Sequence, residues 1–354
     1  MDEIASNGEF EKPAAAGDPL SDVAGVREAL ADWFDGVGKD YPWRRTVDPY
    51  AILVSEIMLQ QTQIATVLGR GYFENWLAKF PDVRTLAAAG EDEILKAWEG
   101  LGYYRRARNL QKAARAVVDD FGGLFPKSHD AILALPGVGE YTAGAVTSFA
   151  YNQAAPMVDA NVARVLARLF DFHTEVDSTA GKKQLTSWSG CLVDPENART
   201  FNSAIMELGQ RICAPRKPAC TTCPVAKFCA CQDPERLPKK KAGAQIEAVE
   251  EFALFVRERD QIWLCQEKGS RRAGLWKLPP IERISLNGRQ LLLATKYSIT
   301  RYRVSLNVYP GTPAEAPGSR GFNLAEIEEL AIASPYRKAL SKLLAETDSL
   351  EKSI

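Results

Sequence analysis

Residues 135–165 read LPGVGEYTAGAVTSFAYNQAAPMVDANVARV, and the LPGVG at their start decides the local fold. Two glycines, Gly137 and Gly139, flank Val138 and let the backbone turn tightly between an amphipathic segment and a helix of small residues. The first turn of that second helix leaves backbone N–H groups free to bind a phosphate. We therefore predict a helix-hairpin-helix in which Gly137, Val138 and Gly139 contact a DNA backbone without reading its bases. A plain turn between two helices is the alternative.

Four cysteines follow with a C-x6-C-x2-C-x5-C spacing: Cys213, Cys220, Cys223 and Cys229. Clustered thiolates in a chain without a recognisable secretion signal indicate a metal or an iron–sulfur cluster, because disulfides form in oxidising compartments. Structural zinc sites usually combine two short clips, whereas only Cys220 and Cys223 form one here. We therefore expect these cysteines to hold a [4Fe–4S] cluster, with zinc as the alternative.

The composition narrows the possible partners of this 354-residue chain. Hydrophobic residues make up 46% and charged residues 25% of it, and no apolar run reaches the roughly 18 residues that a membrane span needs. The net charge of −1 excludes a uniformly basic nucleic-acid binder, so any DNA contact must come from local patches. One such patch, residues 103–115, carries five Lys or Arg and no acid. No membrane partner is expected.

The patterning predicts two folded regions. Apolar residues recur at three- and four-residue spacing up to the cysteines, and an alternating pattern typical of strands replaces them near the C-terminus. We expect a mostly α N-terminal region and a C-terminal α+β domain. The predicted boundaries are a disordered tail at 1–19, the helical region at 20–235, a Pro- and Lys-rich linker at 236–249 and the α+β domain at 250–347.

Inside the C-terminal region, we predict strands at 251–257 and 262–266, joined by a hairpin at Arg259-Asp260, and a further strand at 302–309. Two helices should close the region. Asn323 with Glu326 forms a capping-box pattern for the first, and Ser334-Pro335 is a typical start for the second.

Three motifs taken in order carry a resemblance. LPGVG, then VDANVARV at 158–165, then the four cysteines resemble the helix-hairpin-helix base-excision DNA glycosylases over about residues 20–231. Further motifs are similar to those of the adenine DNA glycosylases, the MutY family: PWR at 42–44, DPY at 48–50, SEIMLQQTQ at 55–63 and GLGYY at 100–104. The resemblance implies a six-helix barrel with an iron–sulfur subdomain. It also implies hydrolytic removal of adenine from mispairs with 8-oxoguanine or guanine in base excision repair.

Two carboxylates suit this chemistry. Breaking a purine N-glycosidic bond needs a proton donor for the base and an anion beside the cationic sugar. Glu56 lies in an apolar segment, where desolvation would raise its pKa and keep it protonated; a solvated helix glutamate is the alternative. Asp159 also fits a plain helix N-cap. The resemblance implies that Glu56 is the general acid and later base, and that Asp159, held by Asn161, faces the sugar cation or a covalent sugar intermediate.

Tyr141 distinguishes two subfamilies. In the related endonuclease III-like enzymes, a lysine at this position of the motif forms a Schiff base with the sugar and cuts the strand. A phenol cannot do this, so we expect a monofunctional glycosylase with Tyr141 near the catalytic carboxylates. Packing of the ring against the core is the alternative.

The resemblance also implies contacts to the mispair. Something must fill the gap that an extruded base leaves, and four residues match family positions that enter the duplex or contact 8-oxoguanine: Gln61, Thr62, Leu101 and Tyr103. Trp43, Arg44 and Leu59 match the wall of the adenine pocket. Each of the apolar residues among them also fits an ordinary core position.

The segment GLWKLP at 274–279 resembles the Nudix-like domain with which adenine glycosylases recognise 8-oxoguanine. The chain lacks the R-E-x2-E-E pattern that binds Mg²⁺ in Nudix hydrolases, so we expect recognition without pyrophosphatase activity. Relatives carry Phe-Ser-His in a loop where this chain has Ile299-Thr300-Arg301. Thr300 is therefore the candidate for the serine's hydroxyl contact, and the histidine has no counterpart.

We expect a monomer that acts on double-stranded DNA in the cytoplasm at a bacterial nucleoid, or in a nucleus if the source is eukaryotic. Three alternatives stay open. They are an endonuclease III-like glycosylase and lyase for oxidised pyrimidines, a noncatalytic iron–sulfur DNA-binding protein, and a Nudix hydrolase with a helical appendage.

Overall fold

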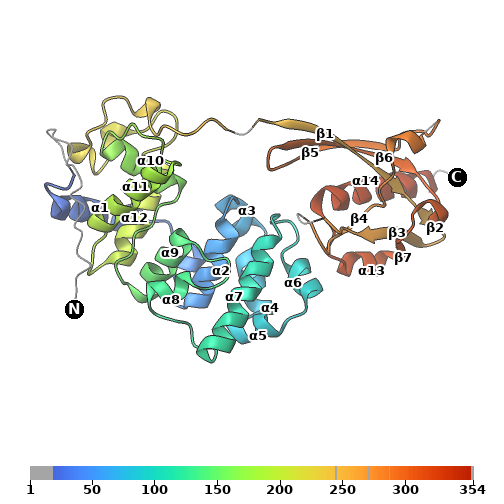
Figure 1. The fold of residues 1–354 in the computed structure, drawn as a ribbon, viewed down its shortest axis with the longest axis horizontal. Coiled ribbons are helices and arrows are strands. Elements are labelled where there is room, and N and C mark those ends of the chain that lie inside the picture. Colours follow the sequence, from blue (N-terminus) through green and yellow to red (C-terminus); the bar gives the residue numbers. More distant parts are fainter. Residues whose placement is uncertain (1–18, 244, 270–271, 287, 352–354) are drawn as a thin grey trace, which may run out of the picture. The chain divides into compact units, whose positions relative to one another are not determined.

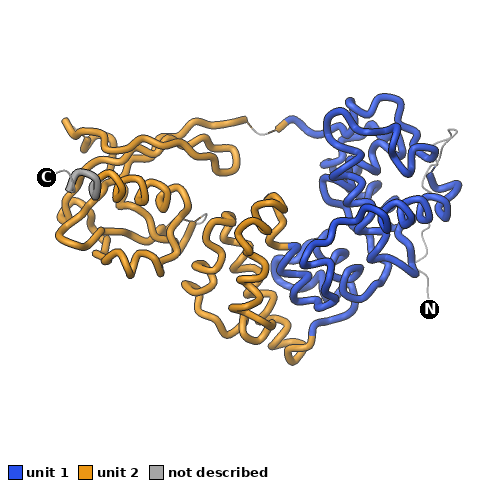
Figure 2. Tube along the Cα trace, turned by 180° about the vertical axis from the view of Figure 1, so that it is seen from behind, with its two compact units in different colours: residues 1–56, 125–242 blue, residues 57–124, 243–354 orange. Residues whose placement is uncertain are grey.

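The computed structural model describes residues 19–243, 245–269, 272–286 and 288–351, so the predicted tail lies outside the described residues except for Pro19. The chain forms two compact units (Figure 2). The first unit comprises residues 1–56 and 125–242, and the second unit comprises residues 57–124 and 243–354. The chain thus leaves the first unit after Glu56, re-enters it at Phe125 and leaves it again near the predicted linker.

The first unit is built from helices (Figure 1). Amphipathic patterning explains their packing: on α10, Val162, Val165, Leu166 and Leu169 recur at helical spacing and are all buried. Helices α1, α11 and α12 contribute to the same core. Its helices are α1 (Val23–Val37), α2 (Pro49–Leu59, which continues into the second unit), α8 (His129–Leu133), α9 (Glu140–Tyr151), α10 (Ala160–Leu169), α11 (Thr179–Leu192) and α12 (Ala198–Arg211), with 3-10 turns at Pro42–Arg44, Cys220–Thr222, Ala226–Phe228 and Pro234–Arg236.

The predicted hairpin between helices is confirmed. Helix α8 ends at Leu133, and α9 begins at Glu140. Between them Gly137 adopts a φ of +78°, a left-handed conformation that a residue with a Cβ rarely takes. The backbone N–H of Val138 donates to the carbonyl of Leu135 at 3.1 Å, which closes the turn.

The helical part of the second unit surrounds large aromatic side chains. Trp76 lies edge-on to both Phe80 and Trp98, and all three are almost fully buried. Such ring pairs bury much apolar area and favour edge-to-face packing. The helices here are α3 (Ile64–Gly69), α4 (Tyr72–Lys79), α5 (Val83–Ala88), α6 (Glu91–Ala97) and α7 (Arg105–Phe121).

All strands of the described chain follow residue 246, so the predicted change from helices to strands is confirmed. One sheet has the order β1-β6-β5, with β1 parallel and β5 antiparallel to β6. In the other, β3 pairs with β2, β4 and β7. The elements are β1 (Glu247–Phe255), β2 (Arg257–Glu258), β3 (Gln261–Gln266), β4 (Trp276–Lys277), β5 (Leu293–Ile299), β6 (Tyr302–Pro310) and β7 (Arg320–Phe322), with 3-10 turns at Arg283–Leu286 and Pro313–Glu315 and helices α13 (Leu324–Glu329) and α14 (Ser334–Glu351).

The strand predictions need several corrections. Strand β1 begins at Glu247 instead of residue 251, because its exposed first half pairs in register with Tyr302 and Arg303 of β6. Strands β4, β5 and β7 were not predicted, although the residues of β5 alternate between half-buried and exposed. The hairpin at Arg259-Asp260 and the capping box of Asn323 with Glu326 are confirmed.

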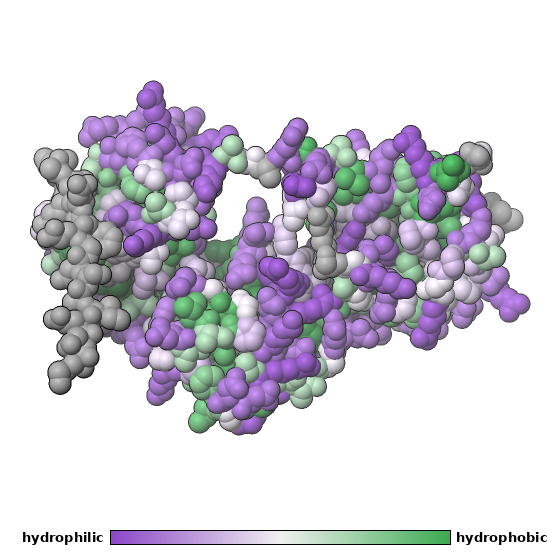
Figure 3. All heavy atoms as spheres, in the orientation of Figure 1, coloured by the Kyte–Doolittle hydropathy of each residue, from purple (hydrophilic) through white to green (hydrophobic). Residues whose placement is uncertain are grey.

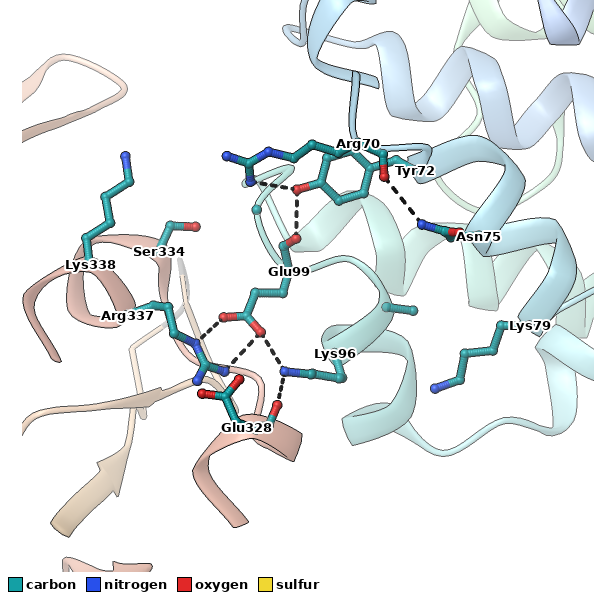
Figure 4. Close-up of a pocket in the computed structure, with 12 residues that line it drawn as sticks. Arg70, Tyr72, Asn75, Lys79, Lys96, Glu99, Glu328, Ser334, Arg337 and Lys338 are labelled. Carbon is teal, nitrogen blue, oxygen red and sulfur yellow. Dashed lines mark hydrogen bonds and ion pairs between the residues drawn. The ribbon is translucent and has the colours of Figure 1, made fainter. Parts of the chain in front are cut away.

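Charged side chains gather in the second unit around Glu99 (Figure 4). The Arg337 guanidinium donates to both carboxylate oxygens of Glu99, at 2.8 and 3.1 Å, and Lys96 donates to one of them at 3.1 Å. These residues line a surface pocket of about 590 Å³. None of the predicted catalytic or mispair-contacting residues lines this pocket.

Hydrophilic side chains cover most of the face seen in Figure 3, and apolar ones form scattered groups. Within the described part of the chain, no helix has the length and apolar character to cross a membrane.

Candidate active site

Glu56 occupies a buried position in the middle of α2. Apart from Ser55, the α2 residues from Tyr50 to Leu59 around it are apolar, and only 5% of its surface is exposed. Burial raises the pKa of Glu56 to about 7; the negative charge of Asp159 adds to the rise, while a hydrogen bond from Tyr141 and the charge of Arg44 oppose it. A carboxyl group with such a pKa exchanges its proton near neutral pH, as an acid–base catalyst must.

Tyr141 is brought to Glu56 by the hairpin, since it is the second residue of α9. Its hydroxyl donates to Glu56 Oε2 at 2.8 Å and lies 4.0 Å from the sulfur of Met206. Burial raises the pKa of Tyr141 well above its ordinary value, and the charges of Glu56 and Asp159 add to the rise. Tyr141 is therefore a neutral donor that faces the Glu56 carboxyl group.

Asp159 precedes α10 and caps it. Its Oδ1 accepts from the backbone N–H of Val162 at 2.7 Å, and its Oδ2 accepts from the side-chain amide of Asn161 at 2.9 Å. The oxygen of that amide accepts from buried Arg164 at 3.0 Å, so a chain of bonds fixes the carboxylate. Asp159 can cap α10 and be held by Asn161 at the same time, because each contact uses a different oxygen of its carboxylate.

Arg44 belongs to a network that includes Glu207, a residue that the sequence analysis did not identify. It donates to the Glu207 carboxylate of α12 at 2.9 Å and lies over the ring of Tyr41, 4.9 Å from its centroid. Tyr41 stacks on buried Trp43 with centroids 5.2 Å apart. Glu207 is fully buried. An acid between apolar residues in FNSAIMELGQR was the available signal, the same one that pointed to Glu56.

The residues predicted to contact the mispair fall in the second unit, apart from Trp43 and Arg44. Leu59 ends α2, and Leu101 is buried. Gln61 and Tyr103 are exposed and take left-handed φ values of +56° and +47°. Two more residues complete this set. Thr62 accepts a hydrogen bond from Arg106 at 3.2 Å. Thr300, with φ +52°, lies in the exposed turn that joins β5 to β6.

The four cysteines follow α12 in a segment with two 3-10 turns. Cys213, Cys223 and Cys229 pack against the apolar core of the first unit. Burial raises the pKa of Cys223 to about 11, and the charges of Cys213, Cys229 and Cys220 add to the rise, which places the four thiols near one another. Among the described residues, no three His, Cys, Asp or Glu side chains are arranged to hold a single metal ion.

An arginine accompanies this cysteine cluster. Arg168, one of the most completely buried side chains, donates to Cys213 Sγ at 3.3 Å and to the carbonyl of Ala214 at 2.7 Å. Its own carbonyl accepts from Cys229 Sγ at 3.5 Å. A fixed cation therefore lies beside the sulfur atoms.

Comparison with known proteins places this site in a family. Residues 54–189 match the HhH-GPD superfamily of base excision DNA repair proteins. The chain is similar to the adenine DNA glycosylase of Homo sapiens, with 43% identity over 219 residues, 59% of this chain and 40% of that protein. It is 34% identical over 255 residues to the adenine DNA glycosylase of Buchnera aphidicola subsp. Baizongia pistaciae, 71% of each chain.

A thermostable thymine-DNA glycosylase of known structure superposes with a TM-score of 0.55 at 34% identity, over 60% of this chain and 98% of that one. The chain spans about half the length, or less, of the mammalian relatives that it matches. With a relative above 30% identity matched over 71% of its length, the chain belongs to the adenine DNA glycosylase family of the HhH-GPD superfamily.

Proposed function

We propose that the chain is a monofunctional adenine DNA glycosylase that removes adenine paired with 8-oxoguanine or guanine in base excision repair. The observation that carries this proposal is the buried Glu56, with a pKa of about 7 and a hydrogen bond from Tyr141. Family membership supports adenine as the base removed. The enzyme acts as a monomer on double-stranded DNA, at a nucleoid or in a nucleus.

In this proposal Glu56 protonates the adenine ring, because adenine leaves poorly as an anion. The bond then breaks toward a sugar with cationic character, and the carboxylate of Asp159 stabilises that charge. Asn161 and the N–H of Val162 hold Asp159 in place. Ionised Glu56 then takes a proton from the attacking water.

Tyr141 supports the monofunctional assignment. The position that faces Glu56 carries a phenol, which is no nucleophile for a Schiff base. Strand cleavage by a lyase step is therefore not expected from this residue, and the product is an abasic site.

The remaining predicted roles extend this proposal. The backbone of Gly137, Val138 and Gly139 grips a DNA phosphate, while Trp43, Arg44 and Leu59 line the adenine pocket. Gln61, Thr62, Leu101 and Tyr103 occupy or border the gap in the duplex. The glycosylase region, 20–235, takes the six-helix barrel form, and the Nudix-like region, 250–347, recognises 8-oxoguanine with help from Thr300.

A [4Fe–4S] cluster fits the cysteine segment. Four thiols lie close enough for their charges to interact, and only Cys220 and Cys223 form the short clip that structural zinc sites usually repeat, which favours a larger cluster over zinc. Arg168 supplies a hydrogen bond to Cys213 Sγ, as groups around metal ligands commonly do. Cys213, Cys220, Cys223 and Cys229 would hold the cluster, which would tie the segment together and present its basic side chains to DNA.

A specific observation favours a second candidate, removal of thymine. The thymine-DNA glycosylase noted above is matched over 98% of its length, although over only 60% of this chain. The Buchnera adenine glycosylase aligns over 71% of the chain, so adenine remains the preferred base.

The test is excision from four duplexes: adenine opposite 8-oxoguanine, adenine opposite guanine, thymine opposite guanine, and thymine glycol opposite adenine. Each is incubated with and without alkali. Breaks at adenine that need alkali support the proposal. Breaks at thymine glycol without alkali overturn it in favour of an endonuclease III-like lyase, breaks at thymine favour the second candidate, and no breaks favour a binding protein.

A further inference from the structure

Arg106, in the first turn of α7, is buried with 9% of its surface exposed, and its side chain joins two separate segments of the second unit. One segment is the end of α2 with the residues that follow it, 57–62; the other is the turn at 101–103. The guanidinium makes six hydrogen bonds: Nη1 donates to the carbonyls of Ile57 at 2.8 Å, Met58 at 2.9 Å and Gln60 at 2.5 Å, and Nη2 donates to Thr62 Oγ1 at 3.2 Å and to the carbonyls of Leu101 at 3.0 Å and Gly102 at 3.2 Å.

These acceptors explain why an arginine is buried here. The last carbonyls of a helix have no partner within it, and two of the six acceptors are the last-turn carbonyls of α2. A cation near a helix C-terminus is also favourable. Burial lowers the pKa of Arg106 to about 10, so the group keeps its charge at neutral pH.

Each segment carries an exposed residue in a strained backbone conformation. Gln61 and Tyr103 take φ values of +56° and +47°, although neither is glycine. Non-glycine residues keep such conformations only where their surroundings impose them. Arg106 bonds to the carbonyl before Gln61 and to the two carbonyls before Tyr103, and its Cζ lies 5.6 Å from the Tyr103 ring centroid.

A second buried group braces the same turn. The Trp98 indole N–H donates to the carbonyl of Gly102 at 3.0 Å, and the Arg106 guanidinium lies 5.3 Å from the Trp98 ring. Backbone atoms of the turn are thus fixed from the inside, while the Tyr103 side chain stays 45% exposed.

We propose that Arg106 is a positioning residue that fixes residues 59–62 and 101–103 as one rigid edge, from which Gln61 and Tyr103 project into the duplex. This inference rests on the proposed function, because a gap must be filled only when a base is extruded. Arg106 itself touches no base; it sets the spacing of two side chains that do.

Lysine cannot replace it in this role. An ammonium is a compact group with three donors, whereas the two terminal nitrogens of the planar guanidinium carry four N–H donors in a fixed fork that reaches both segments. Arg106→Lys therefore keeps the charge and loosens the link. Arg115→Lys is the matched control, because Arg115 lies on the same helix and donates to a single carbonyl, that of Ala87, at 3.1 Å.

The first measurement uses no catalysis. Hydrogen exchange of the full chain should rise in both segments together in Arg106→Lys and in neither in Arg115→Lys. Fluorescence of a duplex with 2-aminopurine in place of the target adenine should rise less on binding to Arg106→Lys, because the unstacked state is held less well.

The second measurement is a double-mutant cycle on single-turnover excision. Arg106→Lys should reduce the rate of excision about tenfold in the wild-type background. In a Gln61→Ala/Tyr103→Ala background the reduction should be only about twofold, because the side chains that Arg106 positions are then gone. Equal losses in both backgrounds, or unchanged exchange in the two segments, would overturn the proposal. If Arg106→Lys does not fold, Thr62→Val removes one acceptor and should raise exchange in both segments; unchanged exchange overturns it again.

Failure of the proposed function is distinguishable from failure of this inference. A wild-type chain that excises no adenine from any duplex removes the proposed function. Hydrogen exchange and 2-aminopurine fluorescence still decide whether Arg106 fixes the two segments and whether they hold an unstacked base.

Discussion

The carboxylate site of the first unit and the rigid edge of the second unit depend on different properties of their residues. In the first, the proposed mechanism makes side-chain identity matter: Glu56 transfers protons, Asp159 stabilises positive charge, and Tyr141 donates a hydrogen bond to Glu56 at 2.8 Å. In the second, backbone shape matters: Gln61 and Tyr103 are held in left-handed conformations, and a buried arginine supplies the bonds. Conservative substitutions should therefore reduce excision severely at the first site and only moderately at the second.

The largest effect is expected at Glu56. Glu56→Gln keeps the size of the side chain but removes the transferable proton, so single-turnover excision should fall by roughly 10²–10⁴-fold while duplex binding remains. Glu28→Gln, at an exposed position of α1, is the matched control and should excise normally. Retained turnover in Glu56→Gln would remove this residue from the mechanism.

Asp159→Asn should follow, with a loss of about 10²-fold in excision, because the amide has no charge to stabilise the sugar cation. Asparagine is itself a good N-cap, so the melting temperature should change little. Asp82→Asn is the control, since Asp82 caps α5 by accepting from the N–H of Thr85 at 2.8 Å. If both variants excise alike, Asp159 serves only as a cap.

The same comparison explains what sequence reasoning found. The hairpin, the cap at Asp159 and the apolar surroundings of Glu56 are local patterns, in which residues a few positions apart determine the structure. The placement of Tyr141 beside Glu56 required a family resemblance, because 85 positions separate the two residues. The local pattern alone did not predict that Tyr141 contacts Glu56.

Arg106 was predicted only as part of a basic patch. Five of its six acceptors are backbone carbonyls, up to 49 positions away, and carbonyls leave no signal in a sequence. The left-handed conformations of Gln61 and Tyr103 were equally hidden, since neither residue type favours them. Strand β5 was missed although its half-buried face carries Thr295, Tyr297 and Ile299, residue types that favour strands.

The pH dependence of stability separates the two regions further. Glu56 has a pKa of about 7 in the folded chain against an ordinary value of 4.5, so the folded state binds its proton more tightly. Its contribution to stability is full below pH 4.5 and is lost as the pH rises through about 7. Glu56→Gln should therefore gain about 3 kcal/mol over the wild type at pH 8 and little at pH 4.5.

Denaturant unfolding at several pH values measures this difference. Excision by the wild type should decline over the same range, as Glu56 loses its proton above pH 7. A stability gain that does not depend on pH would contradict the raised pKa of Glu56.

The smallest effect on stability is expected at Gln61. Glycine relieves the left-handed strain but adds freedom to the unfolded chain, so Gln61→Gly should raise the free energy of unfolding by only about 0.5 kcal/mol. Excision should nevertheless fall several-fold, because the side chain that enters the duplex is gone. Arg259→Gly is the control: Arg259 is also exposed, with φ +55° in the β2–β3 hairpin, and should gain similar stability without loss of excision. Equal excision by both variants would mean that the strain at Gln61 supports no contact with DNA.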